Sequence, residues 1–149
     1  MRIPFQKITV FAALLPFFFG TTFALSSDSV LTFGDVLILY FTDLFPDNNK
    51  AISDVVVKYS GISERQTLRT ALQKGIYYGM LPNTSSELHP DAPMNDRGFA
   101  KLLQKDFGLT INADVSPLTF ADYENIMKNV RASFSFKLIQ ALAQEKNNT

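Results

Sequence analysis

The stretch GIYYGMLPNTSSELHPDAPMNDRGFAKLL, residues 75–103, joins two helical patterns through a long segment rich in proline and polar residues. The apolar residues of 68–72 fall on one face of a helix before it, and apolar residues return at helical spacing after it. Because glycine tolerates backbone conformations that other residues avoid, we expect Gly75 and Gly79 to turn the chain. Asn95 is a good N-cap for the returning helix. The stretch predicts a helix, a long loop and a second helix.

Three segments of the chain end in the same way. They are KYSGI (58–62), QKGI (73–76) and KDFGL (105–109). In each, a lysine in the last turn complements the exposed carbonyls, and the glycine after it can take the left-handed conformation that closes a helix. An aliphatic residue then folds back on the last turn. The pattern predicts three helices that end beside Gly61, Gly75 and Gly108.

The expected helix starts carry capping chemistry. Residues 63–66 have the S-x-x-Q form of a capping box, and T-x-x-D starts occur at Thr32 and Thr119. The stretches SVLTFGDV (29–36) and SPLTFADY (116–123) look like two copies of one phrase. Either similar capping residues arose twice independently or a module was duplicated. The amino-acid sequence alone favours neither explanation.

The sequence therefore predicts an all-α fold, a small helical domain of short helix–loop–helix units over residues 28–143. The expected helices cover 32–44, 50–60, 63–74, 95–107 and 119–143, with a break in the last one near Ser133. Residues 144–149 are expected to form a flexible tail.

Residues 1–24 have the layout of a secretory signal peptide. Arg2 and Lys7 precede an apolar run over 8–19, which is too short to span a membrane, and small residues suited to cleavage follow. An uncleaved N-terminal anchor is the alternative. We expect an exported protein at the cell surface or in the extracellular envelope, with no membrane span after signal cleavage.

The composition bears on partners and stability. The chain has 14 basic and 14 acidic residues, and losing the two in the signal leaves a slight acidic excess. A nucleic-acid partner is not expected, since that would need a concentrated basic face. Without cysteine the fold must be held by packing alone.

The sequence shows no catalytic constellation. His89 is the one histidine, and Ser85 and Ser86 lie too close to it along one loop to build a triad. Residues 43–49 begin like a calcium loop but lack its later glycine and closing glutamate. We predict no enzyme activity, no cofactor and no metal site.

The charged and aromatic residues around the loop allow two interpretations. Asp91, Asp96 and Arg97 either serve the turn and the helix end or form a polar pocket rim that faces a sugar or a carboxylate. Tyr77 and Tyr78 either pack half-buried or offer a platform to carbohydrate.

Four stretches together resemble a single S-layer homology module. They are FTDL (41–44), ALQKGIYYG (71–79), LHPDAPMNDRGFAKLL (88–103) and FGL (107–109). That family runs F-x-D-V, a helix ending in G-I-x-x-G, a loop, and I-T-R-A-E at the start of the next helix. The resemblance covers about 41–109 and is strongest over 71–109. It implies a unit that packs with two sister units around a central helical bundle.

The resemblance also implies a function. Loops and helix starts of the family hold cell-wall polysaccharide, often an acidic one. By that analogy Asn95, Asp96 and Arg97 would be the polar contacts and Tyr77 or Tyr78 the stacking surface, although Asp96 stands where the family has its ligand-binding arginine. We therefore predict a non-catalytic exported module that attaches to the cell envelope by non-covalent binding of cell-wall polysaccharide. The alternative is a protein–protein assembly module of the envelope that binds no glycan and docks on another envelope protein.

Overall fold

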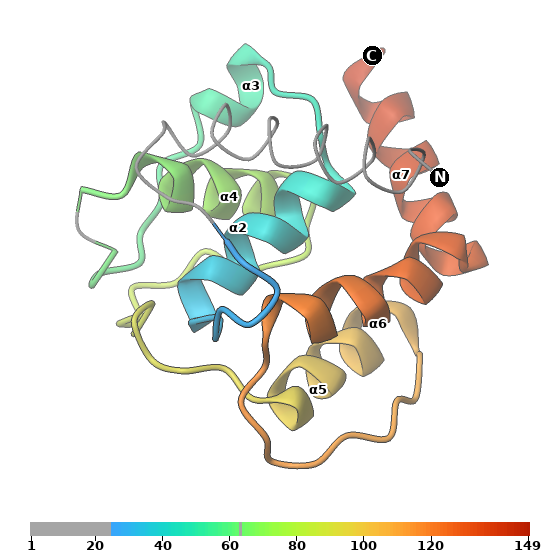
Figure 1. Ribbon diagram of the computed structural model, residues 1–149. Helices are drawn as coiled ribbons and strands as arrows, with labels where there is room; N and C mark the ends of the chain where they lie inside the picture. Colours follow the sequence, from blue (N-terminus) through green and yellow to red (C-terminus); the bar gives the residue numbers. More distant parts are fainter. Residues whose placement is uncertain (1–24, 63) are drawn as a thin grey trace.

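The computed structural model describes residues 25–62 and 64–149, which form six α-helices and no β-strand (Figure 1). The helices are α2 (Phe33–Leu44), α3 (Lys50–Ser53), α4 (Gln66–Tyr77), α5 (Asp96–Phe107), α6 (Phe120–Ala132) and α7 (Phe134–Asn147). The predicted all-α class is confirmed for this part of the chain. The predicted signal peptide, 1–24, lies outside the described residues.

A closed ring of backbone hydrogen bonds joins the starts of α2, α5 and α6. The Leu31 N–H donates to the Leu118 carbonyl at 2.8 Å, the Leu118 N–H to the Met94 carbonyl at 2.9 Å, and the Met94 N–H to the Leu31 carbonyl at 3.0 Å. Each of these residues directly precedes the N-cap of its helix. We call Leu31, Met94 and Leu118 the N-cap ring. It arranges the three helix starts around one pseudo-threefold centre.

The first turns of the same helices are satisfied in an equivalent way. The first two N–H groups of each helix donate to carbonyls that lie three and five residues before the N-cap of a neighbouring helix. These acceptors are Ala92 and Pro90 for α2, Ser116 and Asp114 for α5, and Ser29 and Ser27 for α6. The third N–H of each helix donates to the N-cap side chain, which is Thr32, Asn95 or Thr119. The first amides of a helix have no hydrogen-bond partner inside that helix. In all three helices here, other groups of the protein accept hydrogen bonds from these amides.

Equivalent positions of the three helices also form the core. The fourth and eighth residues of α2, α5 and α6 are at most 1% exposed. They are Val36 and Tyr40, Phe99 and Leu103, and Tyr123 and Met127. The Phe99 and Tyr123 rings stack with centroids 5.2 Å apart. Removing this apolar surface from water is the main stabilising contribution of the bundle.

The contact between α2 and α4 explains why one predicted helix end is wrong. Gly75 lies inside α4 and is buried, and a Cβ there would come within 2.8 Å of Phe41 Cζ. Gly75 thus allows two helices to approach closely. The positive φ of 78° that turns the chain belongs to Gly79, after the helix has ended at Tyr77.

The predicted helix over 50–60 is also wrong beyond its first turn. Only α3 is helical, and residues after it run without regular structure to Ser60, which pairs with the segment at 86–88. Gly61 has the expected positive φ of 79°, but it closes no helix. The third predicted ending is confirmed, because Gly108 caps α5 with a φ of 68°.

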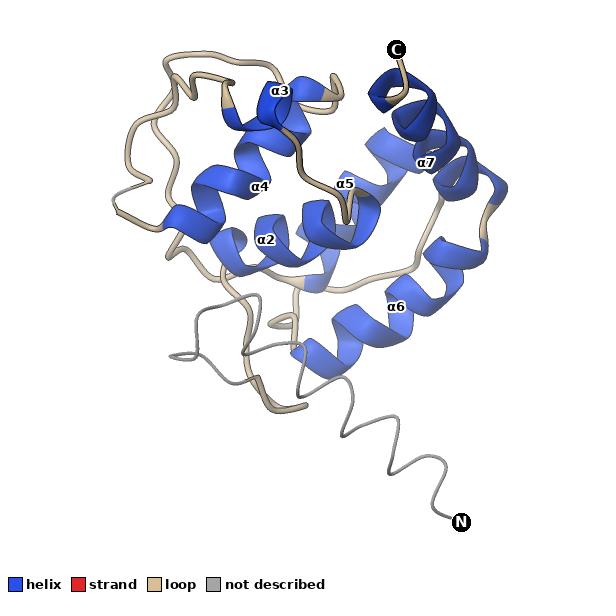
Figure 2. Cartoon of the chain, turned by 90° about the horizontal axis from the view of Figure 1, so that it is seen from above, coloured by secondary structure: helices blue, strands red, loops and turns tan. Residues whose placement is uncertain are grey.

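The predicted helix starts at Thr32, Asn95 and Thr119 are confirmed, with both capping boxes formed. Ser133 ends α6 and caps α7, so the predicted break is confirmed, and the two helices are separate rods joined by a sharp turn (Figure 2). The capping box predicted at 63–66 includes Ser63, which lies outside the described residues, and α4 begins at Gln66 without a side-chain cap.

The end of the chain is more ordered than predicted. The stretch expected to be a flexible tail is helical through Asn147. The Lys146 ammonium donates to the Tyr77 carbonyl at 2.6 Å, which fastens this end of α7 to α4. Over 25–62 and 64–149, no helix combines the length and the apolar character needed to cross a membrane.

The capping boxes give a direct test of the fold. We expect Thr119→Ala to lower the free energy of unfolding by about 1–2 kcal/mol, because the Asp122 N–H loses its acceptor in a part-buried helix start. Urea unfolding measures the change. Thr84→Ala, in an exposed loop where the hydroxyl shares a hydrogen bond with that of Ser86, is the matched control and should leave stability nearly unchanged. Equal effects of the two substitutions would contradict this account.

Candidate functional site

A cleft of about 530 Å³ lies between α6 and the loop that connects α5 to α6. Asp122, Asn125, Ile126 and Asn129 supply one wall, because their spacing places them on one face of α6. Residues 109–113 supply the opposite side, and Asp96 at the start of α5 also lines the space. We call this space the α6 cleft.

The lining of the α6 cleft combines aliphatic and polar groups. Leu109, Ile111 and Ile126 are half-buried and present aliphatic surface. The exposed amides of Asn125 and Asn129 can donate to and accept from hydroxyl groups. A few polar groups around an apolar surface are the usual composition of a small-molecule site.

Asp96 is the most unusual group of the cleft. Its Oδ1 atom is buried and has no hydrogen-bond partner within 25–62 and 64–149. Burial, together with the carboxylates of Asp122 and Asp114, raises the pKa of the Asp96 carboxyl. Since buried polar atoms are nearly always paired in folded proteins, leaving this oxygen without a partner raises the free energy of the folded state.

The starts of α2 and α6 differ in how their carboxylates are neutralised. Asp35 and Asp122 occupy equivalent places, each the third residue of its helix and part of a capping box. Asp35 also pairs with Arg65, whose Nη2 lies 3.4 Å from Oδ1. No ion pair to Asp122 or Asp96 is formed by the part of the chain that the structure describes.

The structure does not bring the predicted polar contacts 95–97 into one site. Asn95 is used as the N-cap, and its side chain accepts from the Gly98 N–H at 2.7 Å. Arg97 is exposed and lines a shallower space of about 190 Å³ with Lys101 and Gln104. Asp96 alone of the three lines the α6 cleft.

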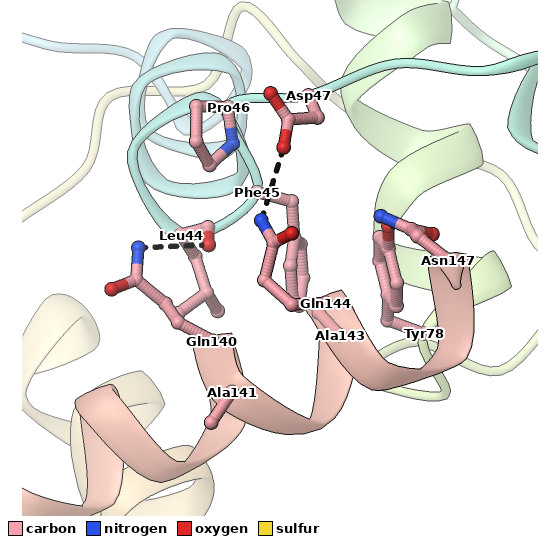
Figure 3. Close-up of a pocket in the computed structure, with 10 residues that line it drawn as sticks. All are labelled: Leu44, Phe45, Pro46, Asp47, Tyr78, Gln140, Ala141, Ala143, Gln144 and Asn147. Carbon is pink, nitrogen blue, oxygen red and sulfur yellow. Dashed lines mark hydrogen bonds between the residues drawn. The ribbon is translucent and has the colours of Figure 1, made fainter.

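The predicted stacking residues lie elsewhere, where the end of α4 meets α7, and Figure 3 shows Tyr78 at this place. The Tyr78 ring stacks on Phe45 with centroids 4.1 Å apart, and its hydroxyl donates to Asn147 at 2.8 Å. The Lys146 ammonium lies 4.0 Å from the centre of the Tyr77 ring. Both tyrosines fasten α7 to the bundle and take no part in the α6 cleft.

The space beside Tyr78 is smaller, about 220 Å³, and its polar groups already have partners. Gln140 Nε2 donates to the Leu44 carbonyl at 3.2 Å, and Gln144 Nε2 donates to Asp47 at 3.0 Å (Figure 3). These bonds fix α7 against the end of α2. The α6 cleft is therefore the better candidate for a binding site.

Sequence reasoning missed Asp122, Asn125 and Asn129 as site residues. Their spacing was a usable signal, because it marks a polar stripe on one helix face. The sequence could not show that residues 109–113 lie opposite this stripe and form the other wall of the cleft. Among the described residues, no group of three His, Cys, Asp or Glu side chains could hold a metal ion.

Comparisons with protein-family models, with curated proteins and with solved structures give no match to this chain. The assignment of the site therefore rests on the geometry, burial and charge of its own residues.

The raised pKa of Asp96 predicts a stability effect. An acid whose folded pKa is raised holds its proton more tightly in the folded state, so stability falls as pH rises through that range. We expect Asp96→Asn to raise the thermal unfolding midpoint at pH 7, with a gain that shrinks as the pH falls toward the ordinary pKa of 3.8. Thermal unfolding of both proteins from pH 7 to pH 4 measures this.

The control for this prediction is Asp54→Asn, which removes the same charge from an exposed surface pair with Lys50. It should change the midpoint little at any pH, since exposed pairs contribute little. A lower midpoint for Asp96→Asn than for the unmodified protein at pH 7 would contradict the proposed environment of Asp96.

Proposed function

We propose that this protein is a non-catalytic exported module that attaches to the cell envelope by non-covalent binding of cell-wall polysaccharide, with the architecture of a divergent S-layer homology module. The single observation that carries the proposal is the joining of three helix starts by the N-cap ring, with the α6 cleft beside one of them.

The N-cap ring supports the resemblance to an S-layer homology module. The sequence shows one such helix–loop–helix unit, and the ring identifies two further helix starts that are equivalent to it. Leu31-Thr32, Met94-Asn95 and Leu118-Thr119 each stand at a helix start, in the place of the I-T pair of the family motif. The family implies three units around a central bundle, and α2, α5 and α6 begin at one ring. Equivalent hydrogen bonds at three starts also favour a duplicated module over capping chemistry that arose separately.

The position and chemistry of the α6 cleft support polysaccharide as the ligand. The family holds its ligand at loops and helix starts, and the cleft is lined by Asp96 at the start of α5 and by the α5–α6 loop. Its aliphatic and amide groups match the apolar faces and hydroxyl groups of a sugar ring. Export is the part of the proposal that depends on residues 1–24.

Retention on purified bacterial cell walls tests the proposal. We expect Asn125→Ala combined with Asn129→Ala to weaken retention about tenfold, because two hydrogen-bonding amides leave the cleft wall. Both side chains are exposed, so the fold should be unaffected. Asn48→Ala combined with Asn148→Ala removes two exposed amides outside the cleft and should retain binding. Absence of retention, or equal retention by both double variants, would overturn the proposal.

One observation favours the second candidate function, an assembly module that binds another envelope protein. Phe134, Leu138 and Leu142 recur every four residues on α7 and are 79%, 44% and 55% exposed. Residues at this spacing form one continuous apolar stripe along a helix. Exposed stripes of this kind commonly mark protein interaction sites.

Sedimentation over a range of protein concentrations tests whether the α7 stripe mediates assembly between copies of this chain. If α7 drives association, Phe134→Ser combined with Leu142→Ser should weaken self-association at least about tenfold, since two exposed apolar side chains leave the stripe. Val56→Ser combined with Val115→Ser removes exposed apolar residues outside α7 and serves as the control. A protein that is monomeric at all concentrations would count against self-association. Deleting α7 would be less informative, because its Phe136 and Ala143 belong to the core.

A further inference from the structure

The α7 stripe, formed by Phe134, Leu138 and Leu142, is symmetric about its middle residue. Phe134 lies four residues before Leu138 and Leu142 lies four residues after it, so each is about 6 Å from it along the helix. A two-fold axis through Leu138, at right angles to α7, therefore maps the stripe onto an antiparallel copy of itself. The three side chains are exposed, and α7 lies at the periphery of the bundle in both views (Figure 1, Figure 2).

A hollow on the flank of α7 matches the projecting Phe134 ring in size and chemistry. It is the space of about 220 Å³ beside Tyr78, and it lies between α7 and the Pro46–Asp47 segment (Figure 3). Its lining is partly aromatic, because the buried Phe45 ring stacks on Tyr78 there. A cavity of roughly 150 Å³ is large enough to hold benzene, so the hollow can admit a phenyl ring.

The hollow and the Phe134 ring lie at similar distances from Leu138, in opposite directions. The α7 residues that line the hollow begin at Gln140 and end at Asn147, so their middle is about 8 Å beyond Leu138. The two-fold axis reverses the direction of α7. It therefore places the Phe134 ring of each copy beside the hollow of the other, in a contact that closes at two copies.

Charges beside the ring and beside the hollow are complementary. Lys137, one turn after Phe134, is exposed and forms no ion pair in the described part of the chain. Asp47 lines the hollow, is exposed and accepts from Gln144, but it likewise has no ion pair there. Helical side chains lean toward the N-terminus of their helix, and in the antiparallel copy that end of α7 lies beside Asp47. The same axis thus brings the ammonium of Lys137 to a carboxylate.

The charges of α7 favour a second copy over a membrane surface. A helix that lies on a membrane carries several lysines or arginines on its polar face. The outward side of α7 carries one cation and one anion, Lys137 and Glu145. Lys146 is turned to α4, where it donates to the Tyr77 carbonyl.

We infer that α7 is the interface of a symmetric antiparallel dimer, in which Phe134 of each copy enters the hollow of the other and Lys137 pairs with Asp47 of the second copy. A second copy of this chain is thus the partner in the second candidate function, on which the inference rests. Three apolar side chains and one ion pair per copy form a small interface compared with the about 800 Å² that each partner of a stable complex buries. We therefore expect a weak dimer, with a dissociation constant of roughly 10 μM to 1 mM.

Exchanging the charges tests the pairing. Lys137→Glu and Asp47→Lys each place like charges opposite one another twice in the symmetric dimer, so each should weaken self-association at least about tenfold. An equal mixture of the two variants forms a mixed dimer in which both pairs are again opposite in charge, and it should associate about as tightly as the unmodified protein. Sedimentation equilibrium at low ionic strength measures all four samples. Lys101→Glu makes the same change at an exposed residue of α5 and is the control.

A single cysteine tests the position of the axis independently. The chain contains no cysteine, so Leu138→Cys introduces one thiol, which should lie next to its equivalent in the second copy. Copper–phenanthroline in air should join the two copies by a disulfide. Val115→Cys, at an exposed residue outside α7, should cross-link much more slowly. Circular dichroism verifies that all variants are folded.

The outcomes separate the dimer from the other proposals. A protein that stays monomeric at about 1 mM overturns the dimer and self-association through α7. Self-association that is unchanged in Lys137→Glu, a mixture no tighter than either variant alone, or equal cross-linking at 138 and 115 overturns this arrangement and leaves assembly by another geometry standing. Retention of the Lys137→Glu variant on cell walls measures polysaccharide attachment without the dimer, so the two proposals can fail separately.

Discussion

The structure depends on the need to pair backbone groups where three helices begin. A helix leaves its first amides without partners inside the helix, and burying them unpaired is unfavourable. Here α2, α5 and α6 resolve this together, because each first turn donates to carbonyls of a neighbouring strand-like segment and the N-cap ring closes the arrangement. None of the three starts is complete without another, so the helices and the core between them form as one unit.

This pairing also limits how the proposed site could act. Since backbone amides at the helix starts are already bonded, any ligand in the α6 cleft would have to be held by side chains along the α6 face and the α5–α6 loop. Asp96 stands at the start of α5 with one buried oxygen that has no partner within 25–62 and 64–149, while Asn95 caps the helix. A residue that raises the free energy of the folded state in this way is typical of a binding site, where stability and function compete.

Local chemistry predicted much of the fold and little of the site. The caps at Thr32, Asn95 and Thr119 and the break at Ser133 follow from residues only three or four positions apart. Gly75 was misassigned because a glycine that closes a helix and a glycine that admits a neighbouring ring look alike in sequence, and only the approach of Phe41 distinguishes them. The sequence left two interpretations open for the tyrosines at 77–78, half-buried packing or a carbohydrate platform, and in the structure both are half-buried and packed.

By itself, the sequence determined the helical class, three capped helix starts and the glycine that closes α5, because each depends on neighbours within one turn of chain. The tertiary structure alone decided that the three starts share one ring, since their carbonyl acceptors come from distant segments. It also decided which carboxylates are neutralised. Arg65 reaches Asp35 from another part of the chain, whereas nothing within 25–62 and 64–149 forms an ion pair with Asp96 or Asp122. Whether a carboxylate gains a cationic partner depends on which residues folding brings close to it. The order of residues in the sequence does not show this.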